Sequence, residues 1–124
     1  MPYLLVVEDD ADSRDALCRF LKSAGYDCDC VADGREAVAA IFARAPDLII
    51  LDLFMPQMDG TGVLKLVRSY LRLQSIPVII WTAFGQSPEV DEIKRLNVAW
   101  IFEKAKATFD DILKVVKNEL ARAA

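Results

Sequence analysis

The sequence predicts an α/β fold with a doubly wound parallel sheet, in which helices cover both faces of the strands. Two observations support this prediction. Strand-like apolar runs alternate with helix-like stretches along the whole chain, with short connections between them. The central run, Leu48-Ile49-Ile50-Leu51, contains no polar residue, which is typical of a strand that is buried on both faces. Five such strand–helix units imply parallel strands joined by right-handed crossovers.

Each element has a signal of its own. Strands are predicted at 3–7, 26–31, 48–51, 78–81 and 98–102, and the second is polar enough to lie at a sheet edge. The helix predicted at 12–24 repeats its apolar residues with helical spacing and stops at Gly25. A short helix with weaker periodicity is predicted at 88–96. The other three helices are predicted from apolar stripes: Ala37, Val38, Ile41 and Phe42; Val63, Leu64, Val67 and Leu71; Phe109, Ile112, Leu113, Val116 and Leu120.

Length and composition indicate one globular domain over residues 1–124. Of the 124 residues, 54% are hydrophobic, enough for a core that buries roughly two thirds of the unfolded surface. No apolar run approaches the ~20 residues that span a bilayer, and Met1-Pro2-Tyr3 enters a strand without a basic leader. We therefore expect no membrane insertion. The net charge of −4 argues against direct binding of nucleic acid.

The three cysteines do not have the spacing of zinc ligands. Cys28 and Cys30 alternate along one predicted strand, so they lie on the same face of it. Together with Cys18 they are an odd number, and we interpret them as small core residues that stay reduced. On these grounds we expect a cytoplasmic protein.

The stretch 47–60, DLIILDLFMPQMDG, defines the expected site. Asp52 follows the buried central strand, Met55-Pro56 interrupts regular structure, and Asp59-Gly60 opens the next helix. In open α/β sheets, ligands bind in the crevice at the carboxyl ends of the strands. Taken alone, Asp52 is equally consistent with an acid that merely caps a strand-to-helix loop.

Polar residues also follow the other strands. Glu8 and Asp9 come after the first strand, Thr82 ends the fourth and Lys104 follows the fifth, so all of them converge with Asp52 on one edge. Two carboxylates ~4 Å apart repel by about 4 kcal/mol at an effective dielectric of 20. Such a cluster needs a proton, a salt bridge or a metal. The chain has no histidine, and oxygen ligands favour magnesium over zinc.

These residues resemble the landmarks of response-regulator receiver domains, the CheY-like signalling domains of two-component systems. The landmarks stand in the family's order: VVEDD at 6–10, LDLFMPQMDG at 51–60, WTAFG at 81–85 and FEK at 102–104. The resemblance covers essentially the whole chain. It implies a flavodoxin-like, five-stranded parallel sheet of order 2-1-3-4-5 with five helices.

The resemblance also implies a role for each acid. Asp52 would accept a phosphoryl group from a phosphohistidine on a histidine kinase or a histidine phosphotransfer protein. Glu8 and Asp9 would form the acid pocket, and Mg²⁺ would be held there together with Asp52 and the backbone carbonyl of Phe54. Such a domain catalyses its own phosphorylation and its own dephosphorylation, rather than the conversion of a separate substrate.

The remaining landmark residues would bind the phosphoryl group and pass on the signal. Thr82, the backbone of Ala83 and Lys104 would contact the phosphoryl oxygens. In the family, the threonine then moves and repacks the face formed by the fourth helix, the fifth strand and the last helix. Trp100 and Ile101 lie on this face, which would bind a downstream protein effector.

The sequence departs from the family pattern on both sides of Lys104. Ala105 stands where the family usually has proline, often after a cis bond. Because a cis bond before a non-proline residue costs ~3 kcal/mol, a trans bond and a differently shaped loop are favoured. Ile101 replaces the family's switch aromatic. The adjacent Trp100 points to the opposite face of the strand, either as a cover for the last helix or as an exposed anchor for a partner.

Phe54 and Phe84 form a third departure, because they stand two residues after Asp52 and Thr82. They flank the expected phosphoryl site. One interpretation is that they only pack on its rim. Our hypothesis is that they also exclude the hydrolytic water and so prolong the phosphorylated state.

Three other functions remain open at this stage. A phosphatase of the haloacid-dehalogenase type also uses an aspartate at a strand end, but Phe54 stands where it needs a second acid. A flavodoxin-like flavin carrier shares the topology, but no loop rich in Ser, Thr and Gly follows the first strand. The main alternative is a pseudo-receiver, a protein-interaction module that works without phosphorylation, for which Ala105 and Ile101 leave room.

Overall fold

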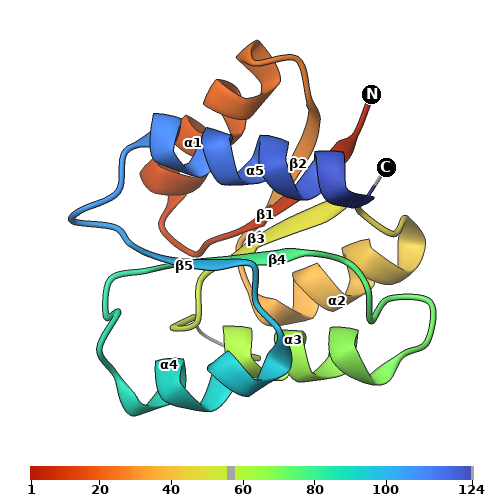
Figure 1. Cartoon of the computed structure of the whole chain (residues 1–124), viewed down its shortest axis with the longest axis vertical. Coiled ribbons are helices and arrows are strands. Elements are labelled where there is room, and N and C mark those ends of the chain that lie inside the picture. The colour runs from red at the N-terminus through yellow and green to blue at the C-terminus, as the bar shows by residue number, and fades with distance from the viewer. Residues whose placement is uncertain (56–57, 124) are drawn as a thin grey trace.

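The computed structural model describes residues 1–55 and 58–123, and its five strands form one parallel sheet of order β2-β1-β3-β4-β5, as predicted (Figure 1). The strands are β1 (Tyr3–Val7), β2 (Asp27–Val31), β3 (Leu48–Leu51), β4 (Val78–Thr82) and β5 (Trp100–Glu103). The helices are α1 (Ala11–Ser23), α2 (Gly34–Ala43), α3 (Gly60–Ser69), α4 (Pro88–Ile93) and α5 (Phe109–Ala123), with a 3-10 turn, η1 (Lys94–Leu96), after α4.

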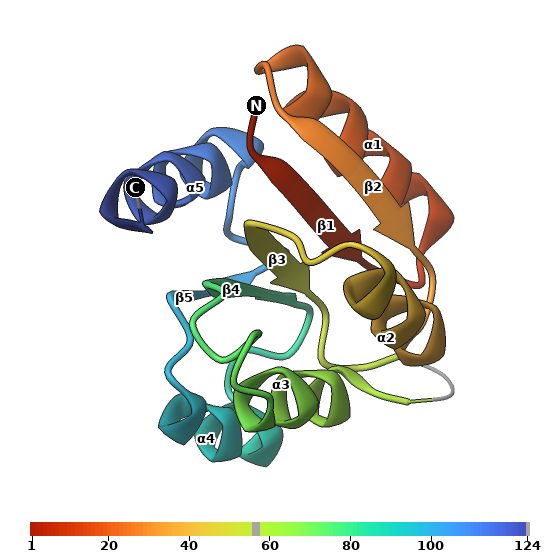
Figure 2. The same cartoon turned by 90° about the vertical axis from the view of Figure 1, so that its right-hand side faces the viewer.

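Helices cover the sheet on both sides, α1 and α5 on one and α2, α3 and α4 on the other (Figures 1 and 2). Alternate residues of β1 therefore enter different cores. Leu4 and Val6 pack toward α1 and α5, whereas Leu5 and Val7 pack toward α2 and α3. This arrangement explains why the central strands have no polar alternation. Within the described residues, no helix has the length and apolar character needed to cross a membrane.

Three helices begin immediately after a loop at the carboxyl edge of the sheet, and an aspartate caps each of them. The side chain of Asp10 accepts a hydrogen bond from the Ser13 N–H at 2.9 Å. Asp33 caps α2 and Asp59 caps α3 in the same way. Because capping satisfies otherwise unpaired N–H groups, these aspartates fix the points at which the chain leaves the edge.

Two apolar residues are more exposed than their helical spacing predicted. Helix α3 ends at Ser69 and Tyr70 is extended, so Leu71 lies beyond the helix and is 83% exposed. Leu73, which also lies beyond the helix, is buried instead of Leu71. Phe42 is 41% exposed and packs edge-on against Tyr70, with ring centroids 5.1 Å apart. The stripes therefore predicted the helices correctly but not all of the buried residues.

Several boundaries also differ from the prediction. β5 begins at Trp100 rather than Val98, and the helix predicted at 88–96 divides into α4 and η1. Asn97, in the left-handed region with φ of 57°, ends η1. Among the described residues there is no cis peptide bond, so the Lys104–Ala105 bond is trans. The predicted break at Pro56 lies outside the described residues.

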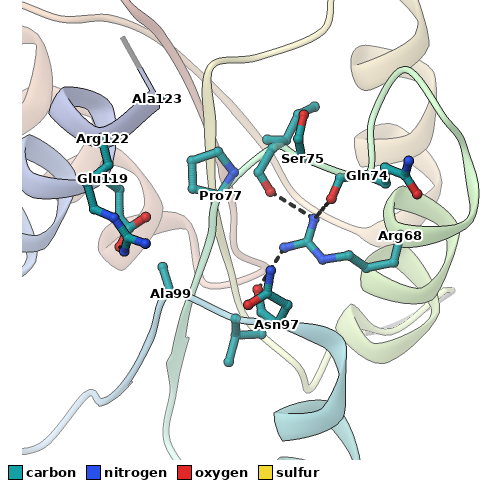
Figure 3. Close-up of a pocket in the computed structure, with 11 residues that line it drawn as sticks. Arg68, Gln74, Ser75, Pro77, Asn97, Ala99, Glu119, Arg122 and Ala123 are labelled. Atoms are coloured by element: carbon teal, nitrogen blue, oxygen red, sulfur yellow. Dashed lines mark hydrogen bonds and ion pairs between the residues drawn. The ribbon is translucent and has the colours of Figure 1, made fainter.

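At the opposite edge of the sheet, Arg68 holds two loops together (Figure 3). Its guanidinium donates hydrogen bonds to the backbone carbonyls of Gln74, Ile76, Leu96 and Asn97, at 2.7 to 3.1 Å. A hollow of about 320 Å³ lies beside these loops. Because the donors of Arg68 are already engaged by carbonyls, we interpret this residue as structural.

We predict that Gly60→Ala destabilises the fold, because α3 starts very close to the end of β3. A Cβ at position 60 would overlap the carbonyl oxygen of Asp52 and lie 2.6 Å from the Cα of Leu53. Overpacking of this kind typically costs about 1–3 kcal/mol. Urea unfolding of the variant should show a loss of this size in the free energy of unfolding.

Gly62→Ala in the same helix is the matched control. Its Cβ would meet the flexible side chain of Met58 at 3.1 Å and Oδ1 of Asp59 at an ordinary contact distance of 3.8 Å, and alanine has the higher helix propensity by about 1 kcal/mol. We expect the free energy of unfolding to change by less than ~1 kcal/mol. Equal effects of the two substitutions would show that the close approach at Gly60 does not matter.

Candidate functional site

Backbone hydrogen bonds beyond the ends of the strands position the predicted site residues. The N–H of Glu8 donates to the carbonyl of Val31 at 3.1 Å, and that of Asp52 donates to Val7 at 3.0 Å. The N–H of Lys104 donates to the carbonyl of Thr82 at 2.8 Å. The sheet therefore places these residues side by side at one edge, as the sequence predicted.

The ammonium of Lys104 lies between two buried carboxylates. Glu8 is 0% exposed and Asp52 is 4% exposed. The Nζ of Lys104 forms an ion pair with Oε1 of Glu8 and another, at 3.2 Å, with Oδ2 of Asp52. The other oxygens of the two acids accept backbone N–H groups, from Asp10 to Glu8 at 3.1 Å and from Phe54 to Asp52 at 3.3 Å.

Burial and these contacts shift the pKa values of Glu8 and Lys104. Burial raises the pKa of Glu8 to about 7, although the contacts with Lys104 and the Asp10 N–H act in the opposite direction. Burial alone would lower the pKa of Lys104, but the hydrogen bond with Glu8 and the charge of Asp52 raise it above the ordinary lysine value. At neutral pH the lysine is therefore charged, and Glu8 is a weaker acid than an exposed glutamate.

Glu8, Asp9 and Asp52 together have the composition of a site for a hard cation. Carboxylate oxygens from all three lie within 4.8 Å of one another. Asp9 is exposed to solvent, which leaves room for water ligands. Oxygen ligands that include water suit Mg²⁺. Arg14 of α1 supports the loop, because its Nη1 donates to the carbonyls of Glu8 at 3.0 Å and Asp9 at 3.4 Å.

Thr82 lies at the same edge but is engaged elsewhere. It is fully buried, and its Oγ1 accepts the Phe84 N–H at 3.3 Å. No hydrogen bond among the described residues joins this hydroxyl to Asp52 or Lys104. Ala83, the next residue, is exposed. Thr82 therefore lies at the carboxyl edge of the sheet, but its hydroxyl oxygen is engaged by the backbone of the loop that follows it.

Phe54 and Phe84 form one aromatic wall on the loops that follow Asp52 and Thr82. Their ring centroids are 5.3 Å apart and the rings meet edge to face at 89°. Both line a hollow of about 450 Å³, together with residues 83 and 85–87 and Glu103. Phe84 is 62% exposed, whereas Phe54 is half-buried. The pair thus lines a hollow that reaches the surface, and the backbone N–H of Phe54 joins it to Asp52.

Trp100 and Ile101 point to opposite faces of β5, as predicted. Ile101 packs against the core formed with α3 and α4. Trp100 is 55% exposed, packs against Phe102 with a centroid distance of 6.1 Å, and borders a surface hollow lined by α5 residues such as Val115. Trp100 therefore partly covers the last helix and also remains accessible to a partner.

Trp81 is a site residue that the sequence did not indicate. Its ring lies 4.9 Å from the Nζ of Lys104 and is 5% exposed. Phe109 of α5 packs against the same ring, with centroids 6.1 Å apart. A cation over a buried aromatic face is attracted to it, so Trp81 helps to hold the ammonium. In the sequence, Trp81 begins the landmark WTAFG, but nothing there indicates its contact with Lys104.

Comparison with known proteins gives the same family throughout. The family model described as the response regulator receiver domain matches residues 4–117. The DNA-binding dual master transcriptional regulator RpaA of Synechocystis is 40% identical over 86 residues, which cover 69% of this chain and 36% of RpaA. Sensory transduction protein RegX3 of Mycolicibacterium smegmatis is 35% identical over 79% of this chain and 41% of its own length. The chain thus spans less than half the length of these relatives.

Solved structures share the fold over nearly the whole chain. The receiver domain of the Francisella response regulator 1452 has a TM-score of 0.90 at 26% identity, with complete coverage of both chains. Chemotaxis response regulator CheY4 of Vibrio cholerae has a TM-score of 0.86 at 31% identity, covering 96% of this chain and 98% of its own. The chain therefore belongs to the receiver-domain family of two-component response regulators.

Proposed function

We propose that this domain accepts a phosphoryl group on Asp52 from a phosphohistidine of a histidine kinase or a histidine phosphotransfer protein. The observation that carries the proposal is the buried Asp52 carboxylate, 3.2 Å from the Lys104 ammonium at the carboxyl edge of the sheet. A carboxylate in this position can act as a nucleophile, and the lysine supplies positive charge beside it.

The transfer requires little chemistry from the protein beyond positioning and charge. An oxygen of Asp52 attacks phosphorus as the bond between phosphorus and the donor's imidazole nitrogen breaks, and the leaving nitrogen takes up a proton. The ammonium of Lys104 balances negative charge on the phosphoryl oxygens. The hydroxyl of Thr82 and the backbone N–H of Ala83 donate hydrogen bonds to the same oxygens. The donor contributes the histidine, so this chain needs none.

We propose Glu8, Asp9, Asp52 and the carbonyl of Phe54 as the residues that hold Mg²⁺. The close approach of the three carboxylates supports this assignment, since one lysine cannot balance three negative charges. When bound, the ion would neutralise charge on the transferring phosphoryl group.

For the output, we propose that the face around Ile101 and Trp100 binds a downstream protein. An aspartyl phosphate adds negative charge and strong acceptor oxygens beside Thr82. Thr82 would give up the Phe84 N–H and turn toward the phosphoryl group, which alters packing along β4 and β5. Ile101 packs on the α4 side, and the exposed Trp100 offers an aromatic contact to the partner.

We predict that incubation with Mg²⁺ and a small acyl phosphate adds one phosphoryl group to the protein, as measured by intact mass. Asp52→Asn should abolish the gain, because an amide is not a nucleophile of this kind. Asp59→Asn is the matched control, since asparagine also caps helices well, and it should be phosphorylated normally. A folded wild-type protein that gains no phosphoryl group in the presence of Mg²⁺ would instead support the pseudo-receiver.

We predict that Phe54 and Phe84 slow the loss of the phosphoryl group by excluding water from Asp52. Phe54→Asn and Phe84→Glu should each speed dephosphorylation about tenfold, equivalent to about 1.4 kcal/mol of barrier. The measurement is the decay of the phosphorylated mass after the donor is removed. If both variants decay at the wild-type rate, the two rings only pack on the rim.

A further inference from the structure

Three cysteines lie on α1 and β2, and none of them is among the residues proposed to bind or accept the phosphoryl group. The Sγ of Cys18 on α1 lies 3.2 Å from the Sγ of Cys28 on β2. Both side chains are nearly inaccessible, at 5% and 1% exposure. Figure 2 shows α1 running alongside β2, the strand at the edge of the sheet. The two sulfurs are therefore in direct contact inside the core.

Cys30 is the third member and the most accessible one. It is two residues beyond Cys28 on β2, so both side chains face the same way, and it packs half-buried against the core that contains Cys18. Burial raises the pKa of the Cys30 thiol, and the thiol of Cys18 raises it further. Cys18 thus touches the buried Cys28 directly, and Cys30, which is reachable from solvent, packs against the same core cluster. All three are free thiols.

We propose that these cysteines form an oxidation site, in which a hydroperoxide reacts at Cys30 and the oxidation ends as a buried Cys18–Cys28 disulfide. The exposure of Cys30 decides where the reaction begins, and the contact between Cys18 and Cys28 decides where it ends.

The oxidation proceeds in three steps. The Cys30 sulfur attacks a peroxide oxygen, the O–O bond breaks, and an alcohol or water leaves, so that Cys30 becomes a sulfenic acid. The Cys18 thiol attacks this sulfur, the S–O bond breaks, and water leaves with the thiol proton. The Cys28 thiol then attacks the Cys18 sulfur and Cys30 departs with the Cys28 proton. Overall, two thiols lose their hydrogens and one hydroperoxide is reduced.

The environment of the thiols determines the character of this site. Burial raises the pKa of Cys28 well above its usual range, so little thiolate forms and the reaction is slow compared with that of a dedicated peroxide sensor. The product is correspondingly protected, because reductants reach a buried disulfide poorly. The bond would tie α1 to β2 and restrict the unfolded chain, which predicts a rise in Tm.

The test treats the reduced full chain with hydrogen peroxide, followed by alkylation of the remaining thiols and by intact mass under non-reducing conditions. We expect a mass loss of two hydrogen atoms, one alkylated thiol out of the three cysteines, a peptide linking Cys18 to Cys28, and a Tm that returns to its original value with dithiothreitol. Absence of an intramolecular disulfide, or a disulfide only between chains, would overturn the proposal.

Three variants separate the steps. Cys30→Ser, at the accessible position, should stay folded and form the disulfide many-fold more slowly. Cys28→Ala should accumulate the Cys18–Cys30 disulfide, and Cys18→Ala should form neither of the two bonds. If Cys30→Ser is oxidised at the wild-type rate, or if Cys28→Ala forms no Cys18–Cys30 bond, Cys30 is not the point of entry and the proposed route is wrong.

Discussion

The ion pairs of Lys104 with Glu8 and Asp52 are the interactions on which the rest of the site depends. Two buried, adjacent carboxylates can both stay ionised only if positive charge lies beside them, and Lys104 supplies it at 3.2 Å from Asp52. The single positive charge of Lys104 does not neutralise this cluster, since burial still raises the pKa of Glu8 to about 7 and Asp9 adds a third acid. The pocket therefore has an excess of negative charge that a divalent cation would balance, which supports the proposed role of Mg²⁺.

The fold places the acid pocket at the carboxyl edge of the sheet and the loop contacts of Arg68 at the opposite edge (Figure 3). At the carboxyl edge, ladder hydrogen bonds continue one residue past β1, β3 and β5 and position Glu8, Asp52 and Lys104. Aspartate caps and the close approach of Gly60 to Asp52 fix the loops there. At the other edge, Arg68 donates hydrogen bonds to the backbone carbonyls of two loops. The strand ends are therefore fixed in place, and they hold charged side chains in buried positions that would otherwise be unfavourable.

Local patterns in the sequence predicted the strands and the polar residues that follow them at the carboxyl edge, whereas the strand order was implied by the resemblance to receiver domains. Every strand except the polar β2 is an apolar run with a polar residue at or just after its end, and the topology then brings these ends together. Contacts between distant segments have no such local signal. The ring of Trp81 beneath Lys104 and the sulfur contact of Cys18 with Cys28 depend on how α5 and α1 pack. Leu71 was placed on α3 because its spacing fits a helix that in fact ends at Ser69.

The measurement that tests the central claim most directly is the rate of phosphorylation by an acyl phosphate in a Lys104→Gln variant. Glutamine can still donate a hydrogen bond to Glu8 but has no charge, so we expect the rate to fall by about 10²-fold, as for loss of a preorganised charge-stabilising group. Lys106→Gln, at a lysine that is exposed and pairs with Glu103, should react at the wild-type rate. A folded Lys104→Gln variant that also reacts at the wild-type rate would contradict the account.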